Sequence, residues 1–459
     1  MSGNDNRGRK TGKCWGSVLK LDNWLAQRSQ TCPDRVALVT AGEQITFAEL
    51  EADAERTARR LAAHGVRRGA NVAVTMNGGR EQVVLIHALM KIGAVILPLS
   101  PKLSGDERAH ALKTGKVNVD LDDPTRLTQT EADMPLLGEH DMEDVHCQIL
   151  TSGSTGPPHT VELTYGNHLF SAMGSAFRIG IDPQDRWLCA VPLSHISGLS
   201  IVMRSVISGT GVVLHDRFDV DQVARAIEED GVTMISLVST TLLRLLEAQV
   251  DLAKLRVVLV GGGPIPQSAI ETALDRGATV ISTYGLTETC SQVTTLEVQE
   301  ARRKAGSVGR PLFTSHLRIQ GGEILVQGPT VSAKELDADG WLHTGDLGRI
   351  DEDGFLYVEG RTDDLIITGG ENVFPGEIED VLVRHPEIIE AAVIGRPHPE
   401  WHHAITAVVV LREDAEIDAD GIREHCRGSL AGYKVPKAVE IATELPRTPS
   451  GKLKRSALR

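Results

Sequence analysis

The residues best suited to chemistry form one short polar stretch. It combines four hydroxyls with two glycines: Thr151, Ser152, Gly153, Ser154, Thr155 and Gly156. These residues bury almost no apolar area, but glycine lets the backbone approach a ligand, and hydroxyls add hydrogen-bond donors. The composition therefore suits a polyphosphate. An ordinary polar turn is the alternative for the stretch taken alone, and no Gly-Lys-Ser/Thr ending makes it a Walker loop.

The flanks of this stretch predict how the chain would hold it. Cys147 to Leu150 is short and apolar, like a buried strand, and the residues from Thr164 onward have helical spacing. We therefore predict a strand-to-helix loop between them.

Two further glycine-containing motifs follow. Val257 to Pro266 predicts a buried strand that ends in a triple glycine, and Pro264 and Pro266 break the pattern of a dinucleotide fingerprint. A tight turn explains the glycines equally well. Ser282 to Glu288 carries Tyr284 and Glu288, for which a core position and a solvent-exposed position are the alternatives to function.

The last third of the chain holds three more polar motifs. Asp346 lies in Trp341 to Leu347, where an isolated aspartate is often a turn-former. Glu359 to Glu379 begins with a polar run suited to a linker or a hinge, because its backbone can absorb a large change. Lys452 lies in a Pro/Ser/Gly loop, where most lysines are solvated.

Together these motifs resemble the adenylate-forming superfamily, which includes acyl-CoA synthetases, luciferases and adenylation domains of peptide synthetases. Ile149 to Asn167 resembles its phosphate loop, and the later motifs follow in the family order across nearly the whole chain. The resemblance implies ATP and Mg²⁺ as cofactors and CoA as co-substrate. It implies a nucleotide site made of Thr151, Ser152, Gly153, Ser154, Thr155, Gly156, Gly261, Gly262, Gly263, Tyr284, Asp346 and Arg361.

The same resemblance implies catalytic roles. Thr287 would reach the phosphates, Glu288 would hold magnesium, and Lys452 would bridge the attacking carboxylate and the α-phosphate. A small domain would rotate about Asp363 between two half-reactions. That rotation would bring a loop to the site for thiolation, formed by Gly369, Gly370 and Glu371.

Within the superfamily, Thr164 to Arg217 looks like the o-succinylbenzoate–CoA ligases of menaquinone biosynthesis. This resemblance places His195 at the mouth of the acyl pocket as a catalytic candidate. Arg204, a cation in an apolar helix, is a candidate partner for the aromatic carboxylate of the substrate. A core histidine and an arginine that snorkels to the surface are the alternatives. The other implied substrate residues are Ser197, Gly198, Leu199 and Gly285.

One position departs from the family pattern. Where the superfamily usually has Pro-Lys-Gly, this chain has Pro158, His159 and Thr160. A neutral imidazole cannot replace a lysine charge at pH 7, so contact with pyrophosphate would be weaker. This departure makes a catalytically weak adenylate-binding homologue one alternative. Two others are independent of it: a ligase for another aryl or fatty acid, and transfer to a carrier-protein phosphopantetheine.

Composition limits the partners. The net charge of -14 argues against nucleic acid or an anionic membrane surface. No apolar run approaches the roughly 20 residues of a membrane helix, and the six cysteines form no CxxC pair. We expect free thiols in a reducing cytoplasm. The oligomeric state is left open, with a homo-oligomer among the options.

Short β-like runs alternate with helical patterns between residues 72 and 282, which predicts an α/β fold with largely parallel sheets covered by helices. We predict a disordered extension over 1–18, a large domain over 19–359, and a small mobile α+β domain over 360–459 with its hinge near 363. Residues 115–144 and 331–339 are weakly patterned, and we expect surface loops there.

Overall fold

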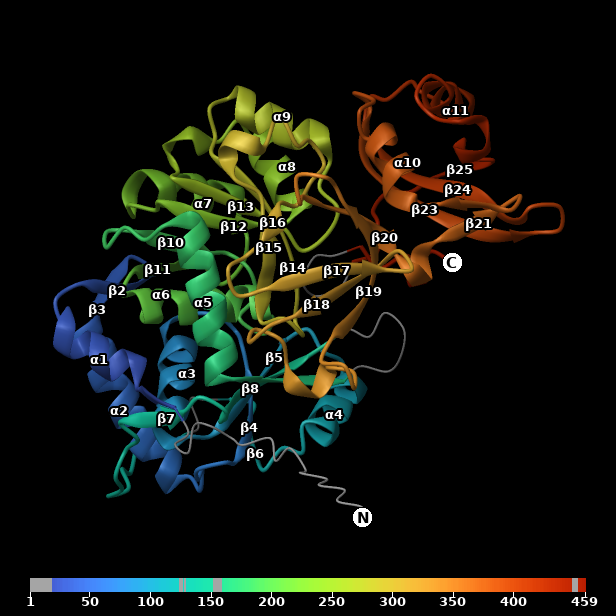
Figure 1. The fold of residues 1–459 in the computed structure, drawn as a ribbon. Helices are drawn as coiled ribbons and strands as arrows, with labels where there is room; N and C mark the ends of the chain where they lie inside the picture. The colour runs from blue at the N-terminus through green and yellow to red at the C-terminus, as the bar shows by residue number, and fades with distance from the viewer. Residues whose placement is uncertain (1–18, 124–126, 128, 152–158, 448–452) are drawn as a thin grey trace, which may run out of the picture.

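The computed structural model describes residues 19–123, 127, 129–151, 159–447 and 453–459. Its largest sheet has nine strands (Figure 1), and the six from β14 to β2 pair in parallel. Five of these, β14 to β11, begin between residues 72 and 282, where the alternating pattern predicts parallel strands. In spatial order the strands are β16 (Arg310–Pro311), β15 (Ser291–Thr295), β14 (Val280–Leu286), β13 (Val257–Val260), β12 (Met234–Leu237), β10 (Arg186–Cys189), β11 (Gly211–Leu214), β2 (Val36–Thr40) and β3 (Glu43–Thr46).

A second sheet has five strands, β6 (Val119–Leu121), β4 (Asn71–Thr75), β5 (Val95–Leu99), β8 (Val145–Leu150) and β9 (Thr160–Thr164). Strand β9 runs antiparallel to β8, so the prediction of a strand-to-helix loop is wrong: the loop joins two strands. The overlooked signal is alternation with a period of two, because Val161 and Leu163 are fully buried while their neighbours are partly exposed.

Helices cover these sheets where apolar residues recur at helical spacing. Helix α2 (Phe47–Ala63) begins at a capping box in which Thr46 Oγ1 accepts a hydrogen bond from the Glu49 amide at 3.2 Å. The other helices of the large part are α1 (Trp24–Thr31), α3 (Arg80–Ile92), α4 (Gly105–Thr114), α5 (Tyr165–Ile179), α6 (Ile196–Ser208), α7 (Val220–Glu229), α8 (Ser239–Glu247) and α9 (Gln267–Asp275).

A four-stranded antiparallel sheet was not foreseen. It consists of β17 (His316–Gln320), β18 (Glu323–Gln327), β19 (Leu342–Ile350) and β20 (Leu356–Arg361). Residues 331–339, expected as a surface loop, begin with Val331 and Ser332, which are buried against this sheet and the site. Residues 115–144 contribute the short strands β6 and β7 (Glu139–Asp141), so they are not simply a loop either.

The C-terminal part has its own core and packs on one side of the rest (Figure 1). Its sheet contains β21 (Ile366–Thr368), β22 (Glu371–Val373), β23 (Ile388–His398), β24 (His402–Leu411) and β25 (Ala438–Ile441), with α10 (Pro375–Leu382) and α11 (Ala419–Arg427). The Gln267 amide donates to Asp380 at 3.1 Å across the junction. The predicted fold class, α/β with a smaller α+β part, is confirmed.

Two predictions from composition can be checked on the described residues. The five cysteines among them are all free thiols. None of the helices in the described part of the chain is long and apolar enough to cross a membrane.

Candidate nucleotide and acyl site

Asp346 brings three elements together. Tyr284 on β14 donates its hydroxyl to Asp346 Oδ2 at 2.7 Å, and Arg361 Nη1 at the end of β20 lies 3.1 Å from Asp346 Oδ1. Burial, together with the charge of Asp346, raises the pKa of Tyr284 well above its usual value, so the phenol remains a donor. The structure thus unites three residues that are far apart in the sequence and that the family resemblance assigns to one nucleotide.

Thr287 and Glu288 follow β14 directly. The Glu288 backbone carbonyl accepts a hydrogen bond from the Ser332 amide at 2.8 Å, which fixes the residue from the 331–339 segment. The Glu288 carboxylate accepts no hydrogen bond from any residue that the structure describes. Burial, together with the nearby charge of Glu288, raises the pKa of Glu335, so the two carboxylates lie close to each other. Half-exposed carboxylate oxygens left available in this way fit a hard divalent cation such as Mg²⁺.

A different constraint applies at each of the three glycine positions after β13. A Cβ at Gly261 would lie 2.7 Å from Thr283 Cγ2, and Gly262 has a φ of +82°. Both positions are thus restricted by the protein itself. Around Gly263 there is open space, so it is the glycine of the three that leaves room for a ligand.

Hydrogen bonds join the two ends of the hydroxyl-rich loop, Thr151 and His159. The Thr151 amide donates to the His159 carbonyl at 2.9 Å, and Thr151 Oγ1 lies 3.1 Å from His159 Nδ1. His159 Nε2 lies 3.9 Å from the carboxylate of Glu335, which belongs to the 331–339 segment whose Ser332 contacts Glu288. The residues between these ends lie outside the described part of the chain: Ser152, Gly153, Ser154, Thr155 and Gly156.

Lys452 also lies outside the described residues. The residues that flank it pair with each other. An isolated β-bridge joins Arg447 and Leu453, and the Lys454 amide donates a hydrogen bond to the Pro446 carbonyl at 2.8 Å.

Helix α6 begins beside the carboxyl end of β10. His195 is its N-cap residue, Ser197 is exposed, and Leu199 is fully buried in the large core. A Cβ at Gly198 would lie 2.4 Å from the Pro192 carbonyl oxygen, so the close approach of the preceding loop requires glycine.

Arg204, further along α6, is buried with only 5% of its surface exposed, so the surface-snorkelling alternative is wrong. Its Nη2 donates to Ser291 Oγ at 2.8 Å, and its guanidinium lies 5.4 Å from the centre of the Trp187 ring. No carboxylate among the described residues pairs with it. Burial lowers the pKa of Arg204 to about 10, which still leaves it charged at neutral pH.

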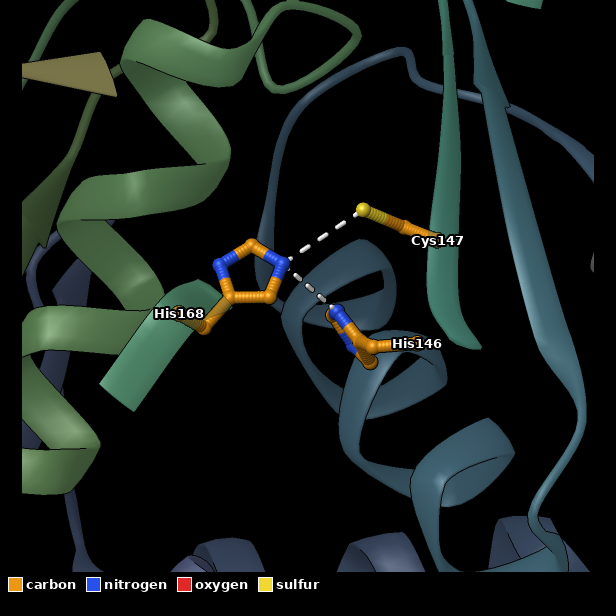
Figure 2. Close-up of side chains that lie close together, drawn as sticks. All are labelled: His146, Cys147 and His168. Carbon is orange, nitrogen blue, oxygen red and sulfur yellow. Dashed lines mark hydrogen bonds between the residues drawn. The ribbon is translucent and has the colours of Figure 1, made fainter. Parts of the chain in front are cut away.

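His146, Cys147 and His168 form a buried cluster (Figure 2), and His168 is near enough to Arg204 for the charge of the guanidinium to act on it. His168 Nε2 is 3.0 Å from His146 Nδ1 and 3.5 Å from Cys147 Sγ. Neighbouring residues of a strand normally point to opposite faces, but a register shift at residues 145–147 lets both turn toward His168.

In this structure the cluster is a hydrogen-bonded network of neutral groups. Burial lowers the pKa of His168 to about 3 and that of His146 well below its usual value, and it raises the pKa of the Cys147 thiol. His168 Nε2 can accept from both neighbours while its Nδ1 faces Cys290 Sγ at 3.4 Å, so every contact has a donor and an acceptor. Sequence reasoning missed these residues; the one available signal was His168 within the TYGNH motif.

The hinge candidates lie at the junction with the C-terminal part. Asp363 is exposed in a short 3-10 turn, and its carbonyl accepts from Arg459 Nη2 at 3.1 Å. Gly369 and Gly370, with φ of +59° and +87°, form the tight turn between β21 and β22, and Glu371 follows.

Comparisons with known proteins identify the family of the chain. Residues 25–333 match the AMP-binding enzyme family, and residues 377–452 match the AMP-binding enzyme C-terminal domain. The 2-succinylbenzoate–CoA ligase of Bacillus subtilis is 40% identical over 96% of this chain and 98% of its own length.

Two solved structures of o-succinylbenzoate CoA synthetase from Bacillus subtilis are 39% identical to this chain and cover 96% of it. The complex with the acyl-adenylate intermediate has a TM-score of 0.89 with 99% of its chain covered. The complex with ATP and magnesium ion has a TM-score of 0.88 with 100% covered. From its matched domains and its overall similarity, the chain belongs to the AMP-binding enzyme family, the adenylate-forming superfamily that its motifs resemble.

Proposed function

We propose that the protein is an AMP-forming ligase that joins o-succinylbenzoate to CoA in menaquinone biosynthesis. In the first half-reaction, an oxygen of the succinyl carboxylate attacks the α-phosphorus of ATP and pyrophosphate leaves. In the second, the CoA thiolate attacks the acyl carbonyl and AMP leaves. Adenylation is needed because a free carboxylate has no good leaving group, and a reducing cytoplasm, where CoA is a free thiol, is the compartment we assign.

The observation that carries the choice of acid is Arg204. A buried cation without an acidic partner is costly, unless a ligand supplies the negative charge. The substrate has two carboxylates, of which one is activated, and the other must be recognised. The fixed guanidinium of Arg204, held by Ser291, supplies charge-assisted hydrogen bonds for that second carboxylate.

We assign the remaining site residues either to nucleotide binding or to the reaction itself. We assign the ribose hydroxyls to Asp346 and Arg361, which already orient each other. Glu288 would hold Mg²⁺, which when bound neutralises charge on the departing pyrophosphate. Phosphate contacts come from Thr287 and from the loop that begins at Thr151, and Tyr284 and the glycines after β13 border the adenine.

The second half-reaction is assigned to a rearrangement of the C-terminal part about Asp363. The exposed hairpin turn formed by Gly369 and Gly370, with Glu371, is then the segment that borders the CoA channel. His159 in place of a lysine favours a slow first half-reaction, because its neighbour Glu335 offsets any charge that it carries.

The test is a panel of acids. Purified protein with ATP and magnesium ion is offered o-succinylbenzoate, other aryl acids and fatty acids. We expect pyrophosphate release and CoA thioester formation with o-succinylbenzoate above all others. Thioester formation only on a carrier-protein phosphopantetheine, or preference for a monocarboxylic acid, would contradict the proposal.

Lys452 provides a prediction that separates the half-reactions. Lys452→Ala should lower adenylate formation by about 100-fold, because it removes the cation placed between two anions. Thioester formation from supplied acyl-adenylate should be spared. Equal loss of both steps would refute the role of Lys452, and Lys454→Ala is the matched control.

A further inference from the structure

The turn that carries Ser291 has an unusual backbone. Cys290 and Ser291 are consecutive non-glycine residues with positive φ, +52° and +97°. Side chains rarely adopt this conformation, and it persists only where the surroundings impose it. Ser291 is also the one described hydrogen-bond partner of Arg204 at the acyl site.

Helix α5 holds this turn by two contacts one helical turn apart. Ser171 Oγ donates to the Cys290 carbonyl at 2.7 Å, and His168 Nδ1 lies 3.4 Å from Cys290 Sγ. Both helix residues are buried, with 2% of their surface exposed. His168 is in turn fixed on its other nitrogen by His146 and Cys147 (Figure 2).

The opposite side of the turn is closed by backbone. A Cβ at Gly285 would lie 1.7 Å from the Ser291 carbonyl oxygen, so the turn occupies the space that a side chain would need. Thr289 Oγ1 accepts from the Leu286 amide at 2.9 Å and lies 3.0 Å from the same Ser291 oxygen. The strained turn therefore has little freedom to relax.

We infer that Ser171, with His168 and Cys290, forms a positioning device for substrate choice: it fixes the strained 290–291 turn so that Ser291 aims the Arg204 guanidinium at the aromatic carboxylate of the acid. This inference rests on the proposed function and extends it to residues that do not touch the substrate. A loosened turn lets Ser291 and Arg204 move, which weakens recognition of the second carboxylate and leaves the activated one unaffected.

The experiment compares two acids, o-succinylbenzoate and benzoylpropionate, which lacks only the aromatic carboxylate. Kcat/KM is measured for both with the full-length protein, Ser171→Ala and the control Ser175→Ala, a buried serine one turn further along α5. In Ser171→Ala we expect the ratio of the two values to fall about fivefold, the effect of one lost hydrogen bond. The fall should come mainly from a higher KM for o-succinylbenzoate, and Ser175→Ala should keep the ratio.

Cys290→Ala, which removes the contact with His168, should lower the same ratio. The inference would be overturned if the ratio of the two kcat/KM values were unchanged in both Ser171→Ala and Cys290→Ala. It would also be overturned if kcat/KM fell equally with both acids and the melting temperature fell as well. If the unmodified protein does not use o-succinylbenzoate at all, the proposed function itself fails, so the two failures are distinguishable.

Discussion

Among the described residues, two cations are buried in apolar helices, and the two differ in the residues that contact them. Lys91 on α3 is 2% exposed and lies 2.5 Å from the Glu51 carboxylate. Arg204 on α6 is 5% exposed and has a serine hydroxyl where Lys91 has an acid. Each has a buried neutral histidine nearby, His87 and His168 respectively.

The difference separates a structural charge from a functional one. Lys91 has an acidic partner within the fold, so the charge of Glu51 compensates its own. Arg204 has no carboxylate partner among the described residues, and this is why we propose that it receives the second carboxylate of the substrate. In the comparison, burial is common to both cations, and the presence of an acidic partner is what differs between them.

The largest effect is expected on the structural side of the comparison. Lys91→Met leaves the Glu51 carboxylate buried and unpaired, and should lower the free energy of unfolding by about 3–5 kcal/mol. Urea denaturation of the variant and of the exposed control Lys102→Met measures this. A loss no larger than that of the control would show that the pair is not the compensated charge that we describe. KM for the acid should be unchanged.

Acidification acts on the histidines beside both cations. Burial, with a contribution from the adjacent cation, lowers the pKa of His87 and of His168 to about 3. Below pH 6.5 these two histidines are protonated in the unfolded chain but remain neutral in the folded chain. The free energy of unfolding therefore falls as pH falls from about 6.5 toward 3. Each histidine should contribute a loss of about 1.4 kcal/mol per pH unit. Urea midpoints that stay level between pH 7 and pH 5 would contradict the neutral state of these side chains.

The smallest effect on stability is expected for Arg204. Arg204→Met removes a buried charge that no acid among the described residues compensates, so the free energy of unfolding should stay within about 1 kcal/mol of the unmodified value or rise. Denaturant unfolding measured beside Lys91→Met gives the contrast directly. A loss as large as that of Lys91→Met would mean that Arg204 is structural too.

Local patterns predicted much of the fold. The parallel strands from β14 to β11 and the helices between them follow from short-range signals that act within the segment itself. The sequence did not predict strand β9, because a five-residue alternation next to a helical pattern is a weak signal. It did not predict the antiparallel sheet from β17 to β20 either, because that sheet lies beyond the last repeat of the α/β pattern.

The site was predictable only where a motif carries it. Tyr284, Asp346 and Arg361 were named from their motifs, and the structure brings them together. The contacts of Ser171 and His168 with the 290–291 turn join segments about 120 residues apart, and no local pattern reports such a contact. The burial of Arg204 likewise depends on packing that its own helix does not reveal.

The most direct test of the account measures how Arg204 distinguishes two acids. Kcat/KM is determined for o-succinylbenzoate and for benzoylpropionate, with the unmodified protein and with Arg204→Met. Because the charge-assisted bond is made only to the aromatic carboxylate, we expect the efficiency with o-succinylbenzoate to fall about 50-fold and that with benzoylpropionate to change little. Equal losses with the two acids, or no loss with either, would contradict the claim that this buried cation recognises the substrate.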